Sequence, residues 1–98
     1  MSLLVEYTVL EGKAEAQVEA LNTLVDGLKA SGARGFSYTA YESDDPTKFY
    51  AVLDFDDDEG KQQFLESDAF AAYRDSAKER FPGPPNATPI RKVASTLD

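Results

Sequence analysis

Histidine and cysteine are both absent from this chain of 98 residues. Without cysteine there is no thiolate nucleophile, and without either residue type there is no Cys/His zinc site. Without histidine there is no imidazole to act as a base near neutral pH, so a Ser-His-Asp triad is excluded. These two absences remove much of the chemistry that small enzymes use.

Positive charge is scarce as well. Ten Lys and Arg residues stand against 18 Asp and Glu residues, which gives a net charge of −8. A nucleic acid attracts Lys and Arg to its phosphates, and an anionic membrane surface attracts the same side chains. Neither a nucleic acid nor a membrane is therefore expected as a partner.

Long hydrophobic runs are missing too. No stretch approaches the roughly 20 apolar residues of a membrane span. Residues 1–10 lack the basic start, apolar run and cleavage site of a signal peptide, so a cytoplasmic protein is expected. With 42% hydrophobic and 29% charged residues, the sequence is typical of one globular domain over residues 1–98. A domain this small buries little surface by itself, which favours an oligomer.

Hydrophobic periodicity predicts four strands and three helices in the order β-α-β-β-α-α-β. The strands are expected at residues 3–10, 34–42, 48–55 and 90–95. The last two helices are expected at residues 56–66 and 68–81. The first helix should end at Gly32 and carry an apolar stripe made of Ala14, Val18, Leu21, Val25 and Leu28. This order predicts a ferredoxin-like α+β fold with an antiparallel sheet.

One face of the predicted sheet has no helix to cover it. Its side chains are a mixture of polar residues with Leu4, Leu10, Tyr41, Tyr50 and Val52. A mixed aromatic surface of this kind favours pairing of two sheets in a homodimer.

The segment from Phe49 to Tyr73 carries motifs that point to a family. A strand with Phe49 and Asp54 leads into an acidic helix start at residues 56–59, and the sequence LESDAF follows at residues 65–70. In these motifs, and in element order over nearly the whole chain, the sequence resembles the superfamily of antibiotic biosynthesis monooxygenases, which are dimeric α/β-barrel proteins. Each motif alone is weak, and their order and spacing carry the resemblance.

The resemblance implies a homodimer whose sheets pack back to back, with a pocket in each subunit between the sheet and its helices. Members of the superfamily include cofactor-free oxygenases that act on phenolic or quinol-type aromatics, and haem-degrading enzymes. Many other members have no known activity.

Four positions depart from the family's functional patterns. Many oxygenase-like members have a histidine where this sequence has Phe64. The haem-degrading branch needs an asparagine, a tryptophan and a histidine near positions that are Val5, Phe55 and Arg74 here. Haem degradation of that type is therefore not expected, no cofactor is expected, and the pocket lacks its usual base.

Two residues are candidate catalytic groups, and five are candidate substrate-binding groups. By the resemblance, Tyr73 lies on the helix that bounds the pocket and can hydrogen-bond a ligand oxygen, and Arg74 can stabilise a developing oxyanion. The substrate-binding candidates are Tyr7, Tyr38, Phe36, Phe55 and Phe64. A structural interpretation stays open for all seven, because tyrosines and phenylalanines often fill a core and a helical arginine is often solvated.

The acidic residues at 54–59 favour structural roles. Asp54 could act as a base with a raised pKa, or pair with a cation at a dimer interface. The run at 56–59 fails as a calcium loop because the glycine comes one place late, at Gly60, and the twelfth position is Leu65. It is better suited to cap a helix, and no metal site is expected.

The leading hypothesis is a cofactor-independent monooxygenase that acts on a small electron-rich aromatic of the quinol or phenol type. The alternative is a dimeric small-ligand-binding or structural member of the same superfamily. An RNA-binding ferredoxin-like domain is disfavoured by the net charge and by the lack of an RNP-like strand. Whether the loop at residues 82–86 caps the pocket or reaches across the dimer is left open.

Overall fold

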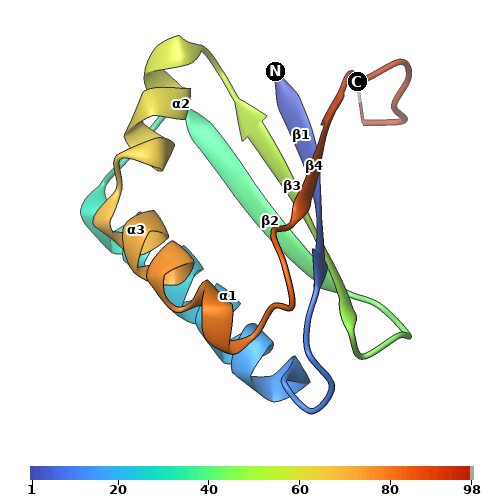
Figure 1. Cartoon of the computed structure of the whole chain (residues 1–98). Coiled ribbons are helices and arrows are strands. Elements are labelled where there is room, and N and C mark those ends of the chain that lie inside the picture. The colour runs from blue at the N-terminus through green and yellow to red at the C-terminus, as the bar shows by residue number, and fades with distance from the viewer. Residues whose placement is uncertain (98) are drawn as a thin grey trace.

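A computed structural model describes residues 1–97 of the chain (Figure 1). Four strands, three helices and one 3-10 turn follow one another in an order that agrees with the sequence. They are β1 (Ser2–Thr8), α1 (Ala14–Ser31), β2 (Phe36–Glu42), β3 (Lys48–Phe55), α2 (Asp58–Leu65), α3 (Asp68–Asp75), η1 (Ala77–Glu79) and β4 (Asn86–Ile90).

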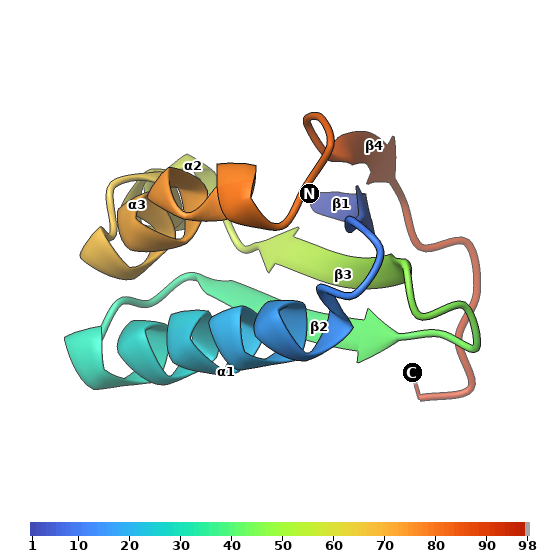
Figure 2. The same cartoon turned by 60° about the horizontal axis from the view of Figure 1, so that its bottom comes forward.

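The strands form one sheet in the order β2-β3-β1-β4, and every neighbouring pair is antiparallel. All three helices pack against the same face of this sheet, and the opposite face carries none (Figures 1 and 2). The predicted ferredoxin-like α+β fold is therefore confirmed.

The core lies between the sheet and the helices because the central strands alternate. In β3 the side chains of Phe49, Ala51, Leu53 and Phe55 are buried, and the residues between them are more exposed. On β1 the side chain of Tyr7 is also buried on this face. This period of two places one row of side chains against the helices and the other row on the open face.

The predicted C-terminal strand is wrong in position. Residues 90–95 were expected to form it, but β4 is Asn86–Ile90 and residues 91–97 form neither helix nor strand. The reason is register: Ile90 pairs with Ser2, where β1 begins, so the chain beyond Ile90 has no further partner. β4 contains Pro89 and is an edge strand, where proline is tolerated.

The apolar stripe of α1 also differs from the prediction. The buried residues are Gln17, Leu21, Leu24 and Leu28, whereas Val18 is 38% exposed. The predicted residues and the observed residues both recur at steps of three and four. Packing against α3 buries the observed set, which contains a glutamine. The helix does end as predicted, since Gly32 adopts a left-handed conformation with φ of 73°.

The predicted helix at residues 68–81 is interrupted. It stops at Asp75 and continues as the short turn η1, although Phe81 still donates its N–H to the Ala77 carbonyl at 2.9 Å. Both short helices begin with side-chain caps. Asp57 accepts from the Gly60 N–H at 2.8 Å, and Ser67 accepts from the Phe70 N–H at 3.2 Å. The capping role predicted for the acidic run is therefore confirmed.

A contact between two glycines brings α2 close to the sheet. Gly60 lies directly against the backbone of Gly35, and a Cβ at position 60 would collide with the Gly35 carbonyl oxygen. That oxygen also accepts the Asp56 N–H at 2.8 Å, so it is held in place. The close approach sets the depth at which Phe64, one helical turn further along α2, enters the core.

Within residues 1–97, no helix is long and apolar enough to cross a membrane. The same part of the chain contains no group of three or more acidic side chains that could hold a metal ion.

Candidate functional site

A cavity of about 300 Å³ lies between the sheet and the helices α2 and α3. Side chains from β1, β2 and β3 form its floor, and α2, α3 and the loop before β4 form its walls. The lining is almost entirely aromatic and aliphatic, and the loop contributes Pro85. A largely apolar cavity with a few convergent polar groups is typical of a site for a small organic ligand.

Phe64 stands at the centre of this aromatic lining and is only 1% exposed. Its ring centroid lies 4.5 Å from that of Phe70, 5.4 Å from Phe36, 5.9 Å from Tyr38 and 6.1 Å from Phe55. The Tyr38 ring is stacked on it, and the Phe36 ring meets it edge-on, which are favourable geometries for aromatic pairs. Phe64, which stands where the resemblance predicted a histidine in many family members, is thus a core residue here.

Three tyrosines supply the polar groups of the cavity. The Tyr7 and Tyr38 hydroxyls share a hydrogen bond of 2.9 Å. The ring of Tyr73 meets that of Tyr7 edge-on at 6.1 Å, and the ring of Phe81 stacks on that of Tyr7 at 5.5 Å. The three phenols therefore form one cluster, held by ring contacts and by the hydrogen bond between Tyr7 and Tyr38.

These phenols stay protonated over the physiological pH range. Burial raises the pKa of Tyr7, and the nearby Tyr38 and Tyr73 hydroxyls raise it further. Burial likewise raises the pKa of Tyr38 and that of Tyr73, although the hydrogen bond from Gln17 partly offsets the effect on Tyr73. A neutral phenol is a good hydrogen-bond donor and a poor base. The cluster can therefore hold a ligand oxygen but cannot take a proton from a ligand.

Two cations line the cavity from α2 and α3. Lys61 is half-buried, and Arg74 is exposed with its guanidinium 4.9 Å from the centroid of the Phe70 ring. Both can attract a ligand that carries negative charge on an oxygen. No carboxylate lines the cavity among residues 1–97.

The structure brings most of the expected site residues together. Six of the seven line the cavity, namely Tyr7, Tyr38, Phe55, Phe64, Tyr73 and Arg74. Phe36 packs against Phe64 but does not line the cavity. Asp54 lies elsewhere: it is exposed and accepts a hydrogen bond from the Ser2 hydroxyl at 2.8 Å, so it cannot serve as a base in this cavity.

Sequence reasoning missed two buried polar residues next to the cavity. Gln17 is 0% exposed and Arg80 is 4% exposed. The Gln17 side-chain nitrogen donates to the Tyr73 hydroxyl at 2.9 Å, and Arg80 donates through Nε to the Gln17 side-chain oxygen at 2.8 Å. The signal was present, because Gln17 occupies a helical position in line with Leu21, Leu24 and Leu28. A glutamine within a leucine stripe indicates a buried polar contact.

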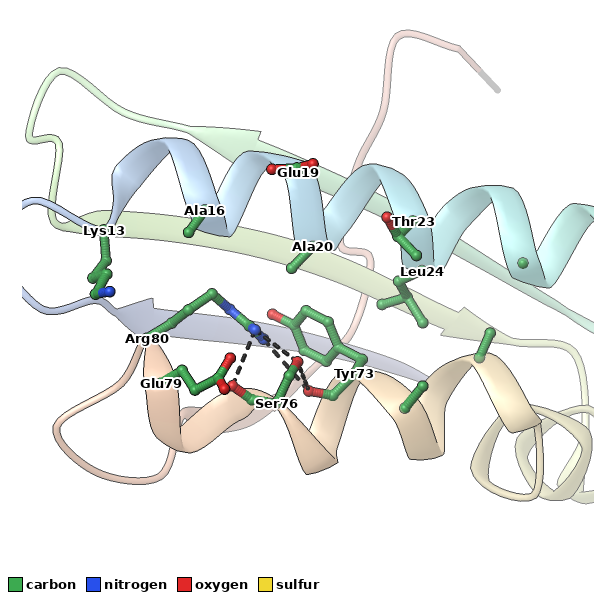
Figure 3. Close-up of a pocket in the computed structure, with 13 residues that line it drawn as sticks. Lys13, Ala16, Glu19, Ala20, Thr23, Leu24, Tyr73, Ser76, Glu79 and Arg80 are labelled. Atoms are coloured by element: carbon green, nitrogen blue, oxygen red, sulfur yellow. Dashed lines mark hydrogen bonds between the residues drawn. The ribbon is translucent and has the colours of Figure 1, made fainter.

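Arg80 and Tyr73 also line a second depression, an open groove between α1 and α3 that we call the helix groove (Figure 3). The Arg80 Nη1 donates to the Ser76 hydroxyl at 2.7 Å and to the Ser76 carbonyl at 3.1 Å. Its guanidinium lies 5.0 Å from the centroid of the Tyr73 ring. Tyr73 therefore separates the helix groove from the aromatic cavity.

The family model named antibiotic biosynthesis monooxygenase matches residues 1–76, more than three quarters of the chain. The chain therefore belongs to this family. Membership supports a role as a monooxygenase-like or small-molecule-binding protein. No curated protein matches the sequence significantly.

Solved structures share the fold over almost the whole chain. A protein of unknown function from Nitrosomonas europaea is 23% identical, with a TM-score of 0.80 over 99% of this chain and 92% of its own. A candidate antibiotic biosynthesis monooxygenase from the same organism is 19% identical, with a TM-score of 0.81 and coverage of 95% and 98%. A protein from Mycobacterium tuberculosis is 16% identical, with a TM-score of 0.78 and coverage of 95% and 97%. These likenesses establish the fold.

Proposed function

We propose that this protein is a cofactor-independent monooxygenase that acts on a small electron-rich aromatic of the quinol or phenol type. The observation that carries the proposal is the cavity itself: it is lined by aromatic rings, has three neutral phenols within it, and has two cations in its wall. A planar aromatic fits between such rings, and its oxygens find donors in Tyr7, Tyr38 or Tyr73.

In this reaction the substrate supplies the electrons. The ionised substrate donates electrons to O2 and forms a carbon–oxygen bond, which gives a peroxide. Protonation and cleavage of the O–O bond then leave one oxygen atom as the product carbonyl. The other oxygen atom leaves as water with the two hydrogen atoms that the substrate loses. Tyr73 and Arg74 would hold the negative charge on the substrate oxygen during these steps, because charge stabilisation is the largest contribution a preorganised site makes.

The protein offers no base for the first proton, because the phenols are neutral and no carboxylate among residues 1–97 lines the cavity. The substrate must therefore lose its proton to solvent. We expect O2 uptake to rise with pH through the pKa of the substrate itself. Uptake with anthrone and with 1,4-naphthalenediol, corrected for uncatalysed oxidation, should thus show two different midpoints.

A matched variant sharpens this test. Tyr73→Phe keeps the ring but removes the donor, so it should lose most of the catalysed uptake while the purified protein still binds the aromatic. A common midpoint for both substrates would point to a titrating protein group and would contradict the base-free mechanism. No catalysed uptake, together with tight binding, would favour the second candidate function.

That second candidate is a non-catalytic binder of small hydrophobic molecules. The buried position of Phe64 favours it, because this ring occupies the place of a family histidine and leaves the cavity apolar.

We also propose that the protein is a homodimer through the open face of its sheet. Val52 lies at the centre of this face, paired with Leu4 on β1 and with Thr39 on β2. Tyr50 is flanked by Tyr41, which is 52% exposed in the single chain. A second copy would cover this surface by the same residues, as a two-fold interface requires.

A lysine at the centre of that face should abolish the dimer. We expect Val52→Lys to sediment as a monomer at micromolar concentration, because the buried ammonium group would have no partner. Val18→Lys makes the same change on the helix layer, at a valine that is 38% exposed, and should leave the sedimentation unchanged. A dimer that survives Val52→Lys would place the interface elsewhere.

A further inference from the structure

Three buried polar side chains are joined in series by hydrogen bonds, and the series ends at the aromatic cavity. Arg80 donates through Nε to the side-chain oxygen Oε1 of Gln17 at 2.8 Å. The side-chain nitrogen Nε2 of Gln17 donates to the Tyr73 hydroxyl at 2.9 Å. Gln17 and Arg80 are 0% and 4% exposed, so water does not compete for these bonds. Arg80 lies beyond residues 1–76, the part of the chain that the family model matches.

The direction of these hydrogen bonds is fixed by chemistry. A guanidinium group has donors only, so the Gln17 amide must turn its oxygen to Arg80. Its NH2 group then faces Tyr73, and the Tyr73 oxygen must accept. A phenol that accepts from one side has its own proton left for a partner elsewhere. On the cavity side that partner is the Tyr7 hydroxyl, which also shares a hydrogen bond with Tyr38, or a ligand oxygen that takes its place.

Arg80 places a positive charge at one end of this hydrogen-bonded series of side chains. The partners of its guanidinium within residues 1–97 are the neutral oxygens of Gln17, Ser76 and Tyr73. Figure 3 shows the bonds to Ser76 and Tyr73. Its charge is thus not neutralised by an ion pair with these partners. A cation behind a row of aligned donors favours negative charge on an atom at the far end of the row.

From these contacts we infer that Arg80 and Gln17 are positioning residues that fix the Tyr73 hydroxyl as a donor toward the cavity. The cavity therefore selects an aromatic ligand that presents an acceptor oxygen to Tyr73, either a carbonyl or an ionised phenol. This inference rests on the proposed function as far as the cavity binds small aromatics, and it adds the polarity of the ligand atom.

The test reverses the polarity of residue 17 without changing its shape. In Gln17→Glu both carboxylate oxygens accept, so one receives the Arg80 Nε–H and the other receives the Tyr73 proton. Tyr73 then has no proton for the cavity. If Gln17 has only a structural role, Glu at this position keeps both hydrogen bonds and should change nothing.

The probes are 1-tetralone, which has one carbonyl oxygen, and tetralin, the same ring system without it. Dissociation constants are measured by isothermal titration. The wild-type protein should bind 1-tetralone about tenfold more tightly than tetralin, the contribution of about one good hydrogen bond. Gln17→Glu should abolish this preference and leave the affinity for tetralin unchanged.

A second variant guards against misfolding of the first. Arg80→Met frees the Gln17 amide to turn over, so it should also lower the preference for the ketone while tetralin still binds. A tenfold preference that persists in both variants would overturn the inference, and so would equal binding of the two probes by the wild type. If neither probe binds to the wild type, the proposed function itself fails, and the inference falls with it.

Discussion

Replacing Phe64 with alanine should lower the free energy of unfolding by about 4 kcal/mol, within the range seen for buried phenylalanines. The Phe64 side chain is 1% exposed and meets the rings of Phe36, Tyr38, Phe55 and Phe70. Alanine would remove all four ring contacts and leave a void, because the backbone of α2 is held against Gly35 and cannot collapse inward. Urea denaturation followed by circular dichroism measures the loss. The thermal midpoint should fall by roughly 15–30 °C.

Leu65→Ala is the matched control, since Leu65 is next to Phe64 on the same helix and is 41% exposed. It should cost about 1 kcal/mol or less. Naphthalene should stabilise Phe64→Ala more than the wild type, because the new void adjoins the existing cavity. A loss below about 1 kcal/mol for Phe64→Ala would mean that this ring is not an anchor of the core.

Alkaline pH should unfold the protein steeply. Burial raises the pKa of Tyr7, Tyr38 and Tyr73 in the folded state, whereas in the unfolded chain their pKa lies near 10.0, the ordinary value for tyrosine. Their contribution to stability is therefore complete below about pH 10 and is lost as the pH rises above it. In that range the unfolded chain has released the Tyr7 and Tyr38 protons, which the folded chain keeps, and Tyr73 adds a smaller difference. The free energy of unfolding should then fall by about 3 kcal/mol per pH unit, at about 1.4 for each of Tyr7 and Tyr38, with a smaller addition from Tyr73.

Two spectroscopic signals check this prediction together. The near-ultraviolet absorbance of the three buried phenolates should appear in step with the loss of circular dichroism. Tyr38→Phe should reduce the slope of stability against pH by about a third to a half, because it removes one of the two large contributions. Ionisation of all five tyrosines of the chain near pH 10, with the circular dichroism intact, would contradict the prediction.

Local patterns carried enough information to predict most of the fold. The strand at Lys48–Phe55 was predicted with its observed bounds, because a run of mainly aromatic and aliphatic residues follows a turn and ends at an acidic helix start. The last strand was misplaced because its position depends on pairing with β1 at the other end of the chain. No local pattern encodes that register. The stripe of α1 was misassigned because two sets of residues have helical spacing, and only packing against α3 distinguishes them.

The candidate site was predicted in part for the same reason. Strand alternation was sufficient to place Tyr7 and Tyr38 on the helix side, and the spacing of Phe70 and Tyr73 was sufficient to turn Tyr73 inward. Arg80, whose guanidinium contacts Tyr73, was not among the predicted site residues. Arg74 follows Tyr73 directly, yet it is exposed, while Arg80 is buried beneath the helix groove. Its burial depends on the break after Asp75, where the helix tightens into η1.

The proline at the outer edge of the sheet bears on how the molecule can aggregate. Pro89 lies in β4, the edge strand that follows β1, and every residue of β4 is exposed. An exposed edge invites further strands, and such growth has no natural end, so it leads toward fibres. Proline has no N–H to offer an incoming strand, so the ladder of hydrogen bonds is broken at that point. The face of the sheet can still pair once and close, whereas its edge resists indefinite extension.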